Sequence, residues 1–220
     1  MSVDGVIFDL DGTLVDSLDD LADSVNAVLV VRGFDPHPRD TYRDFVGNGI
    51  TELVRRALGA PGSDTALLEA CVVAVRDEYE SRWNRKTRPY PGIAETLVTL
   101  REYGLALAVL SNKPHSLTVR VVDRYFGADT FQAVLGAEVG YERKPDPAGA
   151  LAIAQRLGIS PRRWLYVGDS AIDILTALAA GMIPVGVLWG FRDTRELAAA
   201  GALRLVREPI EICAYARATP

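Results

Sequence analysis

Short apolar runs alternate with amphipathic stretches over most of the chain. The runs are apolar throughout rather than at every second position, which is typical of strands buried on both faces of a parallel sheet. They cover residues 6–8, 105–110, 133–135, 164–167 and 183–188. Strands that alternate with helices predict a doubly wound, mostly parallel α/β core of the Rossmann-like kind.

Glycines mark where the intervening helices are expected to end. The amphipathic stretches cover residues 93–103, 116–125, 148–157 and 172–180. The glycines that follow them are Gly104, Gly127, Gly158 and Gly181. Helices commonly end at a residue in the left-handed conformation, which glycine adopts without strain, so each glycine indicates a helix C-terminus.

One segment has helical patterning and no strand. Helices are expected at residues 17–31, 50–58 and 64–83, and Ser17 with Asp20 three positions later predicts a capping pair at the start of the first. Residues 84–92 contain two prolines and a glycine and form the expected return linker. We therefore predict a core of residues 1–15 and 86–220 and an inserted, all-helical domain of residues 16–85.

Composition excludes several classes of function. Of 220 residues, 49% are hydrophobic and 24% charged, and the formal charge is −5, so no basic surface for nucleic acid is expected. No apolar run is long enough to span a bilayer, no secretory signal is recognisable, and the two cysteines are far apart. We expect a cytoplasmic protein without membrane or nucleic-acid partners, and leave monomer or homodimer open.

Carboxylates gather where the predicted strands end. Asp9 and Asp11 follow the first strand, and Asp169 follows the strand at 164–167 with Asp173 one helical turn later. The carboxyl ends of parallel strands meet at one edge of a sheet, where α/β proteins bind ligands. Like charges at the end of a buried strand raise each other's pKa or require a cation.

A hydroxyl and two ammonium groups are expected at the same edge. Ser111 and Lys113 follow the strand at 105–110, and Lys144 stands in a loop before a helix. Clustered carboxylate oxygens suit Mg²⁺, which completes its coordination with water and substrate phosphate. The combination favours phosphoryl transfer: one carboxylate attacks phosphorus, a second exchanges the proton, and Ser111 with Lys144 neutralises the phosphoryl oxygens.

Four short motifs resemble those of the haloacid dehalogenase superfamily of phosphohydrolases. They are DLDGT at 9–13, SN at 111–112, KP at 144–145 and GDSAID at 168–173. They occur in the family's order, and the resemblance covers essentially the whole chain, with residues 16–85 resembling the family's helical cap.

The resemblance implies a role for each motif residue. Asp9 is expected to be the nucleophile and a Mg²⁺ ligand. Asp11 is expected to be the general acid and base and a ligand through its backbone carbonyl. Asp169 is the third ligand, which Asp173 supports, although a helix N-terminal charge also explains Asp173. Ser111 and Lys144 are expected to bind phosphate.

Longer strings are similar to bacterial phosphoglycolate phosphatases. These are VGNG at 46–49, SNKP at 111–114 and VGDSAIDILTALAAGM at 167–182. They imply a Mg²⁺-dependent phosphomonoester hydrolase that forms an aspartyl-phosphate and acts on a small phosphorylated metabolite such as 2-phosphoglycolate. Further candidate substrate contacts are Thr13, Asn48, Asn112 and Lys113. Turn formation explains Thr13 and Asn48 equally well, and Lys113 could simply be solvated.

Other reactions and classes stay open. A sugar-phosphate mutase similar to β-phosphoglucomutase and an inorganic pyrophosphatase would use the same core. A binding module without catalysis is disfavoured because Asp9 and Asp11 are both present. Phosphonate hydrolysis through a cap lysine is excluded because residues 17–83 contain no lysine.

Overall fold

The computed structural model describes residues 2–202 and 204–217. It divides into two compact units: the core unit, Met1–Val15 with Pro89–Pro220, and the helical unit, Asp16–Arg88. The chain leaves the core unit through β2 (Val15–Asp16) and returns through β3 (Arg88–Pro89), and these two short strands pair with each other.

The core unit is built on a six-stranded sheet with the order β5-β4-β1-β6-β7-β8. Every neighbouring pair is parallel, as predicted. The strands are β1 (Gly5–Phe8), β4 (Ala106–Pro114), β5 (Ala133–Ala137), β6 (Trp164–Gly168), β7 (Ile183–Val187) and β8 (Arg204–Val206). All four residues of β1 are buried, because β4 and β6 flank this strand and helices cover the sheet.

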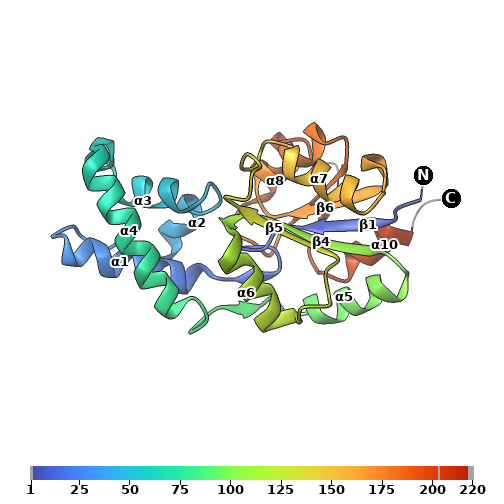
Figure 1. Ribbon diagram of the computed structural model, residues 1–220, viewed down its shortest axis with the longest axis horizontal. Coiled ribbons are helices and arrows are strands. Elements are labelled where there is room, and N and C mark those ends of the chain that lie inside the picture. Colours follow the sequence, from blue (N-terminus) through green and yellow to red (C-terminus); the bar gives the residue numbers. More distant parts are fainter. Residues whose placement is uncertain (1, 203, 218–220) are drawn as a thin grey trace. The chain divides into compact units, whose positions relative to one another are not determined.

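Helices cover both faces of this sheet, so the fold is doubly wound (Figure 1). In Figure 1, α7 (Ala148–Arg156) and α8 (Ala171–Ala179) lie above the sheet, and α5 (Ile93–Glu102) and α6 (His115–Phe126) lie below it. The four glycines after these helices all have positive φ, between 67° and 83°, which confirms the predicted helix ends.

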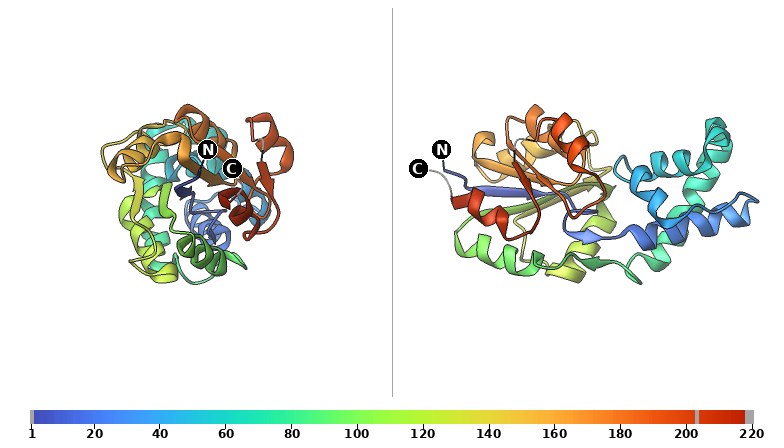
Figure 2. Two further views of the ribbon diagram at one scale, coloured as in Figure 1. Left: turned by 90° about the vertical axis from the view of Figure 1, so that its right-hand side faces the viewer. Right: turned by 180° about the vertical axis from the view of Figure 1, so that it is seen from behind.

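Sequence patterning missed the last part of the core unit. It contains α9 (Thr194–Ala199), β8 and α10 (Glu211–Arg217), which are short and therefore carry little periodicity. Their stability comes from tertiary contacts: β8 pairs with β7, and α10 packs beside α5 (Figure 2). No helix of the described residues is both long and apolar enough to cross a membrane.

The second strand of the sheet is longer than its apolar run. β4 continues to Pro114, with a shift in its register against β5 after Leu110. Ser111, Asn112 and Lys113 therefore lie within the strand and not beyond its end. The strand holds these side chains more rigidly than a loop would.

The helical unit contains α1 (Leu18–Val31), α2 (Tyr42–Phe45), α3 (Ile50–Leu58) and α4 (Thr65–Arg82). The predicted capping pair at its start is wrong, because Ser17 makes no side-chain cap bond to α1. The carboxylate of Asp20, 1% exposed, instead accepts hydrogen bonds from the backbone amides of Lys86 and Thr87 and from the Thr87 hydroxyl, at 2.8–3.0 Å. Asp20 thus ties the two ends of the helical unit together.

Candidate active site

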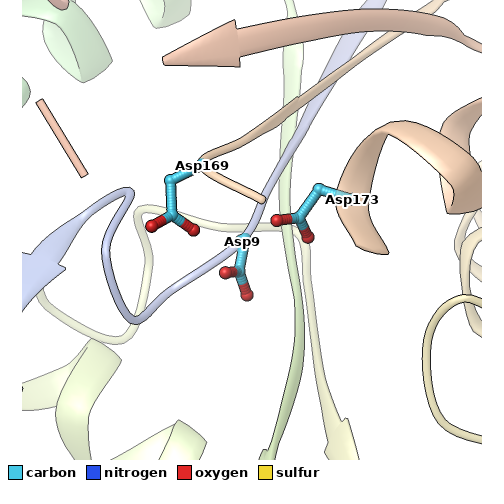
Figure 3. A group of neighbouring side chains, drawn as sticks. All are labelled: Asp9, Asp169 and Asp173. Atoms are coloured by element: carbon cyan, nitrogen blue, oxygen red, sulfur yellow. The ribbon is translucent and has the colours of Figure 1, made fainter. Parts of the chain in front are cut away.

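Three carboxylates meet at the carboxyl edge of the sheet. Asp9 follows β1, Asp169 follows β6, and Asp173 lies in the first turn of α8 (Figure 3). One oxygen from each lies within 4.8 Å of the others. The three residues are 8%, 3% and 0% exposed, so little water screens their charges. The sequence expectation that these side chains converge is confirmed.

Glycines allow the carboxylates to approach. A Cβ on Gly12, whose φ is +90°, would lie 2.2 Å from an oxygen of Asp169. A Cβ on Gly168 would lie 2.2 Å from the Cβ of Asp173, and one on Gly190 would lie 2.3 Å from the Cβ of Asp169. Each distance is far inside van der Waals contact, so a side chain at any of these positions would displace the cluster.

The charge of the cluster is only partly neutralised by the protein. Burial raises the pKa of Asp9 to about 7, and this exceeds the opposing effect of Lys144. Burial, together with the neighbouring charges of Asp173 and Asp9, holds the pKa of Asp169 well above its usual range. The protein's positive charges and hydrogen bonds therefore offset only part of the free-energy cost of removing these carboxylates from water.

Lys144 supplies part of the missing charge. Its Nζ donates to an oxygen of Asp9 and to an oxygen of Asp173, each at 2.7 Å. Burial alone would lower the pKa of Lys144, but Asp173 and Asp9 outweigh it and raise the pKa well above its ordinary value. The ammonium is therefore a fixed positive charge against the Asp9 carboxylate.

Asn112 positions the Lys144 loop. Its amide nitrogen donates to the carbonyl of Lys144 at 3.1 Å, and its amide oxygen accepts from the Lys144 backbone N–H at 2.9 Å. Both ends of the amide are thus engaged with the backbone. We revise the expected substrate contact at Asn112 to support of Lys144.

Asp173 combines the two roles that the sequence left open. One of its oxygens accepts from the Ser170 backbone N–H at 3.1 Å and from the Ser170 hydroxyl at 2.7 Å, which completes a capping box at the start of α8. The other oxygen accepts from Lys144. Because both oxygens already have donors, Asp173 is better suited to support the cluster than to bind a cation directly.

Asp11 lies beside the cluster and pairs with Lys113. The Lys113 ammonium is 2.8 Å from both oxygens of Asp11, and the two side chains are 4% and 14% exposed. Lys113 is therefore buried and paired, not solvated. The structure separates the two lysines: Lys144 contacts Asp9, and Lys113 contacts Asp11.

The remaining predicted residues have varied surroundings. Ser111 is buried, and its hydroxyl accepts from the Lys113 backbone N–H at 3.2 Å. Thr13 is fully buried, its carbonyl accepts from the Trp189 indole at 3.0 Å, and its hydroxyl has no hydrogen-bond partner among the described residues. These contacts fit the turn-forming interpretation of Thr13. Asn48 is exposed in the helical unit, before α3.

Two features of the site escaped the sequence analysis. The Phe191 backbone N–H donates to Asp169 at 2.7 Å from the segment after β7, and the rule that ligands gather beyond strand ends points to that segment. Tyr166 is fully buried on β6, and burial raises the pKa of its phenol, which Lys144 opposes. A tyrosine inside an apolar strand gave no such signal.

The donor set fits a hard divalent cation. When ionised, the four aspartates Asp9, Asp11, Asp169 and Asp173 exceed the two lysines by two negative charges. The ligands on offer are carboxylate oxygens, which Mg²⁺ prefers over nitrogen or sulfur. Asp9 and Asp169 are the residues placed to hold it.

Comparison with known proteins agrees with this arrangement. The chain is 37% identical over 196 residues to a phosphoglycolate phosphatase of Pseudomonas putida, covering 87% of this chain and 72% of that protein. It is 38% identical over 205 residues to a phosphoglycolate phosphatase of Neisseria meningitidis, covering 92% and 87%.

Solved structures with the same fold include proteins described as phosphoglycolate phosphatases. A protein of Lactobacillus delbrueckii subsp. bulgaricus superimposes with a TM-score of 0.93 at 28% identity, with complete coverage of both chains. A predicted phosphoglycolate phosphatase of Haemophilus somnus superimposes with a TM-score of 0.91 at 28% identity, covering 99% of both chains. The sequence model of the haloacid dehalogenase-like hydrolase family matches residues 6–187, and the chain belongs to this family of hydrolases.

Proposed function

We propose that the protein is a Mg²⁺-dependent phosphomonoester hydrolase that works through a phosphorylated Asp9. Its substrate is a small anionic organophosphate, with 2-phosphoglycolate as the leading candidate. The observation that supports the proposal most directly is the hydrogen bonding of the Asp9 carboxylate. Lys144 fixes one of its oxygens, and the other accepts no hydrogen bond from any residue that the structure describes. That second oxygen is available to attack phosphorus.

The cation contributes positive charge that the protein lacks. Bound by Asp9 and Asp169, Mg²⁺ supplies Lewis-acid stabilisation of the phosphoryl oxygens and offsets repulsion from the carboxylates. Lys144 supplies a second positive charge, and Ser111 a hydroxyl, at the same edge.

The reaction has two halves. In the first, the free oxygen of Asp9 bonds to phosphorus, the bond from phosphorus to the alcohol oxygen breaks, and Asp11 gives its proton to that oxygen. In the second, water bonds to phosphorus, Asp11 takes a proton from it, and the bond to Asp9 breaks to release phosphate. The first half leaves Asp9 phosphorylated and Asp11 without its proton, and the second half restores both residues.

We assign the helical unit the role of a cap that selects substrate and excludes water. The chain passes between the units at β2 and β3, so these strands are the proposed hinges. Asn48, exposed before α3, stays a candidate substrate contact in this role.

A substrate panel tests the proposal. p-Nitrophenyl phosphate, 2-phosphoglycolate, β-glucose 1-phosphate and pyrophosphate are incubated with Mg²⁺, and phosphate release is measured. Hydrolysis of 2-phosphoglycolate is expected, with acid-stable phosphate on the protein that Asp9→Asn abolishes. Asp129→Asn, an exposed carboxylate outside the cluster, serves as the matched control.

Other outcomes of the panel are informative. An isomer of glucose phosphate would identify a mutase, and exclusive cleavage of pyrophosphate would identify a pyrophosphatase. An unchanged rate in Asp9→Asn would refute the covalent mechanism.

A further inference from the structure

We propose that Lys113 recognises negative charge on the alcohol part of the substrate and thereby sets substrate specificity. This inference rests on the proposed function, in which Asp11 serves the leaving oxygen. It names a substrate class: phosphomonoesters whose alcohol carries a carboxylate or another anionic group within a few atoms of the ester oxygen.

Two hydrogen bonds and close packing against β5 hold the backbone of Lys113 in place. Its N–H donates to the Ser111 hydroxyl at 3.2 Å, and its carbonyl accepts from the Thr118 hydroxyl at 3.1 Å. A Cβ on Gly136 would lie 2.6 Å from that carbonyl oxygen, so β5 packs directly against it. The lysine is therefore held at one place in β4, which is the preorganisation that specific recognition requires.

The position of the ammonium places it at the leaving group. It lies 2.8 Å from both oxygens of Asp11, the residue proposed to give a proton to the alcohol oxygen. Lys144, in contrast, contacts Asp9, the residue proposed to bond to phosphorus. The two lysines thus divide the substrate: Lys144 faces the phosphoryl group, and Lys113 faces the alcohol.

Burial makes the Lys113 charge selective. Its side chain is 4% exposed and the Asp11 side chain beside it is 14% exposed, so little water screens the charges of this pair. In a site with little water, an ammonium attracts an anion much more strongly than it does in bulk solvent. A substrate with an anionic alcohol gains this attraction, and a neutral one of the same size does not.

The choice of lysine supports a specific role. The chain has 24 basic residues, of which three are lysines: Lys86, Lys113 and Lys144. The two that are buried both lie in this site. A lysine presents a compact point charge, whereas an arginine presents a broader planar group.

The test compares two substrates that differ in one group of the alcohol, which is charged in one substrate and neutral in the other. 2-Phosphoglycolate and ethyl phosphate share the phosphate ester and the two-carbon skeleton, but ethyl phosphate has a methyl group in place of the carboxylate. The kcat/KM of the wild type should favour 2-phosphoglycolate, and Lys113→Met should reduce this preference about 10- to 100-fold. Any loss of Asp11 positioning affects both substrates and cancels in the ratio.

Two further variants control the measurement. Lys113→Arg keeps the charge and should retain part of the preference. Lys86→Met makes the same substitution at an exposed lysine, which pairs with Asp23 in the helical unit, and should leave the ratio unchanged. A ratio that Lys113→Met does not alter would overturn the inference and leave Lys113 as a positioning residue for Asp11.

A binding measurement separates this inference from the proposed function. Calorimetry in the Asp9→Asn background measures the Kd of both compounds without turnover, and Lys113→Met should abolish the preference for 2-phosphoglycolate there as well. Charge-dependent binding without any hydrolysis by the wild type would refute the proposed function alone. Equal Kd values for both compounds in the Asp9→Asn chain would refute the role of Lys113 alone.

Discussion

Replacement of Asp9 by Asn should stabilise the metal-free protein at pH 8, although it removes the proposed nucleophile. Folding raises the pKa of Asp9 from 3.8 to about 7, mainly through burial. The folded protein therefore binds this proton more tightly than the unfolded chain does. The resulting contribution to stability is complete below about pH 4 and is lost as the pH rises to about 7.

The magnitude of this stabilisation follows from the pKa shift of Asp9. One pKa unit corresponds to ~1.4 kcal/mol, so ionisation of Asp9 costs about 4 kcal/mol of stability above pH 7. Asparagine resembles the protonated carboxyl in shape and has no charge to bury. Lys144 keeps its other carboxylate partner, Asp173, at 2.7 Å. In a chain of this size 1 kcal/mol corresponds to ~2–4 °C in Tm, so a gain of roughly 8–16 °C is expected.

The assay is thermal unfolding in EDTA at pH 4.5, 6 and 8, followed by circular dichroism. The Tm of Asp9→Asn should match that of the wild type at pH 4.5 and exceed it increasingly towards pH 8. Excess Mg²⁺ should raise the wild-type Tm at pH 8 and reduce the difference. Asp129→Asn, which is exposed, should show no such trend. A variant no more stable than the wild type at pH 8, or a difference that does not change with pH, would show that Asp9 is not under electrostatic strain.

Three further substitutions test the scaffold of the site. Gly5→Ala places a Cβ 2.4 Å from the ring of Trp164 and should lower the free energy of unfolding by about 1–3 kcal/mol in urea titrations. Asn112→Ala removes both amide contacts to the Lys144 backbone; kcat should fall at least tenfold with a smaller change in KM, and equal changes in both would argue for a direct substrate contact instead. Asp20→Ala leaves two backbone amides of the helical unit without their acceptor and should speed hydrogen exchange there, whereas unchanged protection at those amides would contradict the bracing role.

Local patterns were sufficient to predict the sheet and the convergence of its carboxylates. The apolar runs identified five of the six strands because a strand buried on both faces must be apolar throughout. Since the ends of parallel strands share an edge, Asp9 and Asp169 could be placed together although 159 residues separate them.

Other contacts were invisible because they join residues that are distant in the sequence. Asp20 matched the spacing of a helix cap, yet its carboxylate binds amides 66 and 67 positions later. Asn112 matched a family motif, but whether its amide faces a ligand or the Lys144 backbone depends on the path of another loop. Short elements such as β8 lack periodicity and form only because β7 offers a partner.

The distribution of charge in the site argues that it was shaped by function and not by stability. Lys144 bridges Asp9 and Asp173, and Lys113 pairs with Asp11. Each ammonium therefore lies beside carboxylates whose negative charge it neutralises. Asp169 accepts a hydrogen bond from the Phe191 backbone N–H, but burial and the charges of Asp173 and Asp9 outweigh it and hold the pKa of Asp169 high. Stability alone would favour an uncharged residue at this position, because burial of a carboxylate that is only partly compensated by positive charge is costly. The excess negative charge fits the cation proposed at Asp9 and Asp169, and the two lysines supply positive charge for the proposed anionic substrate.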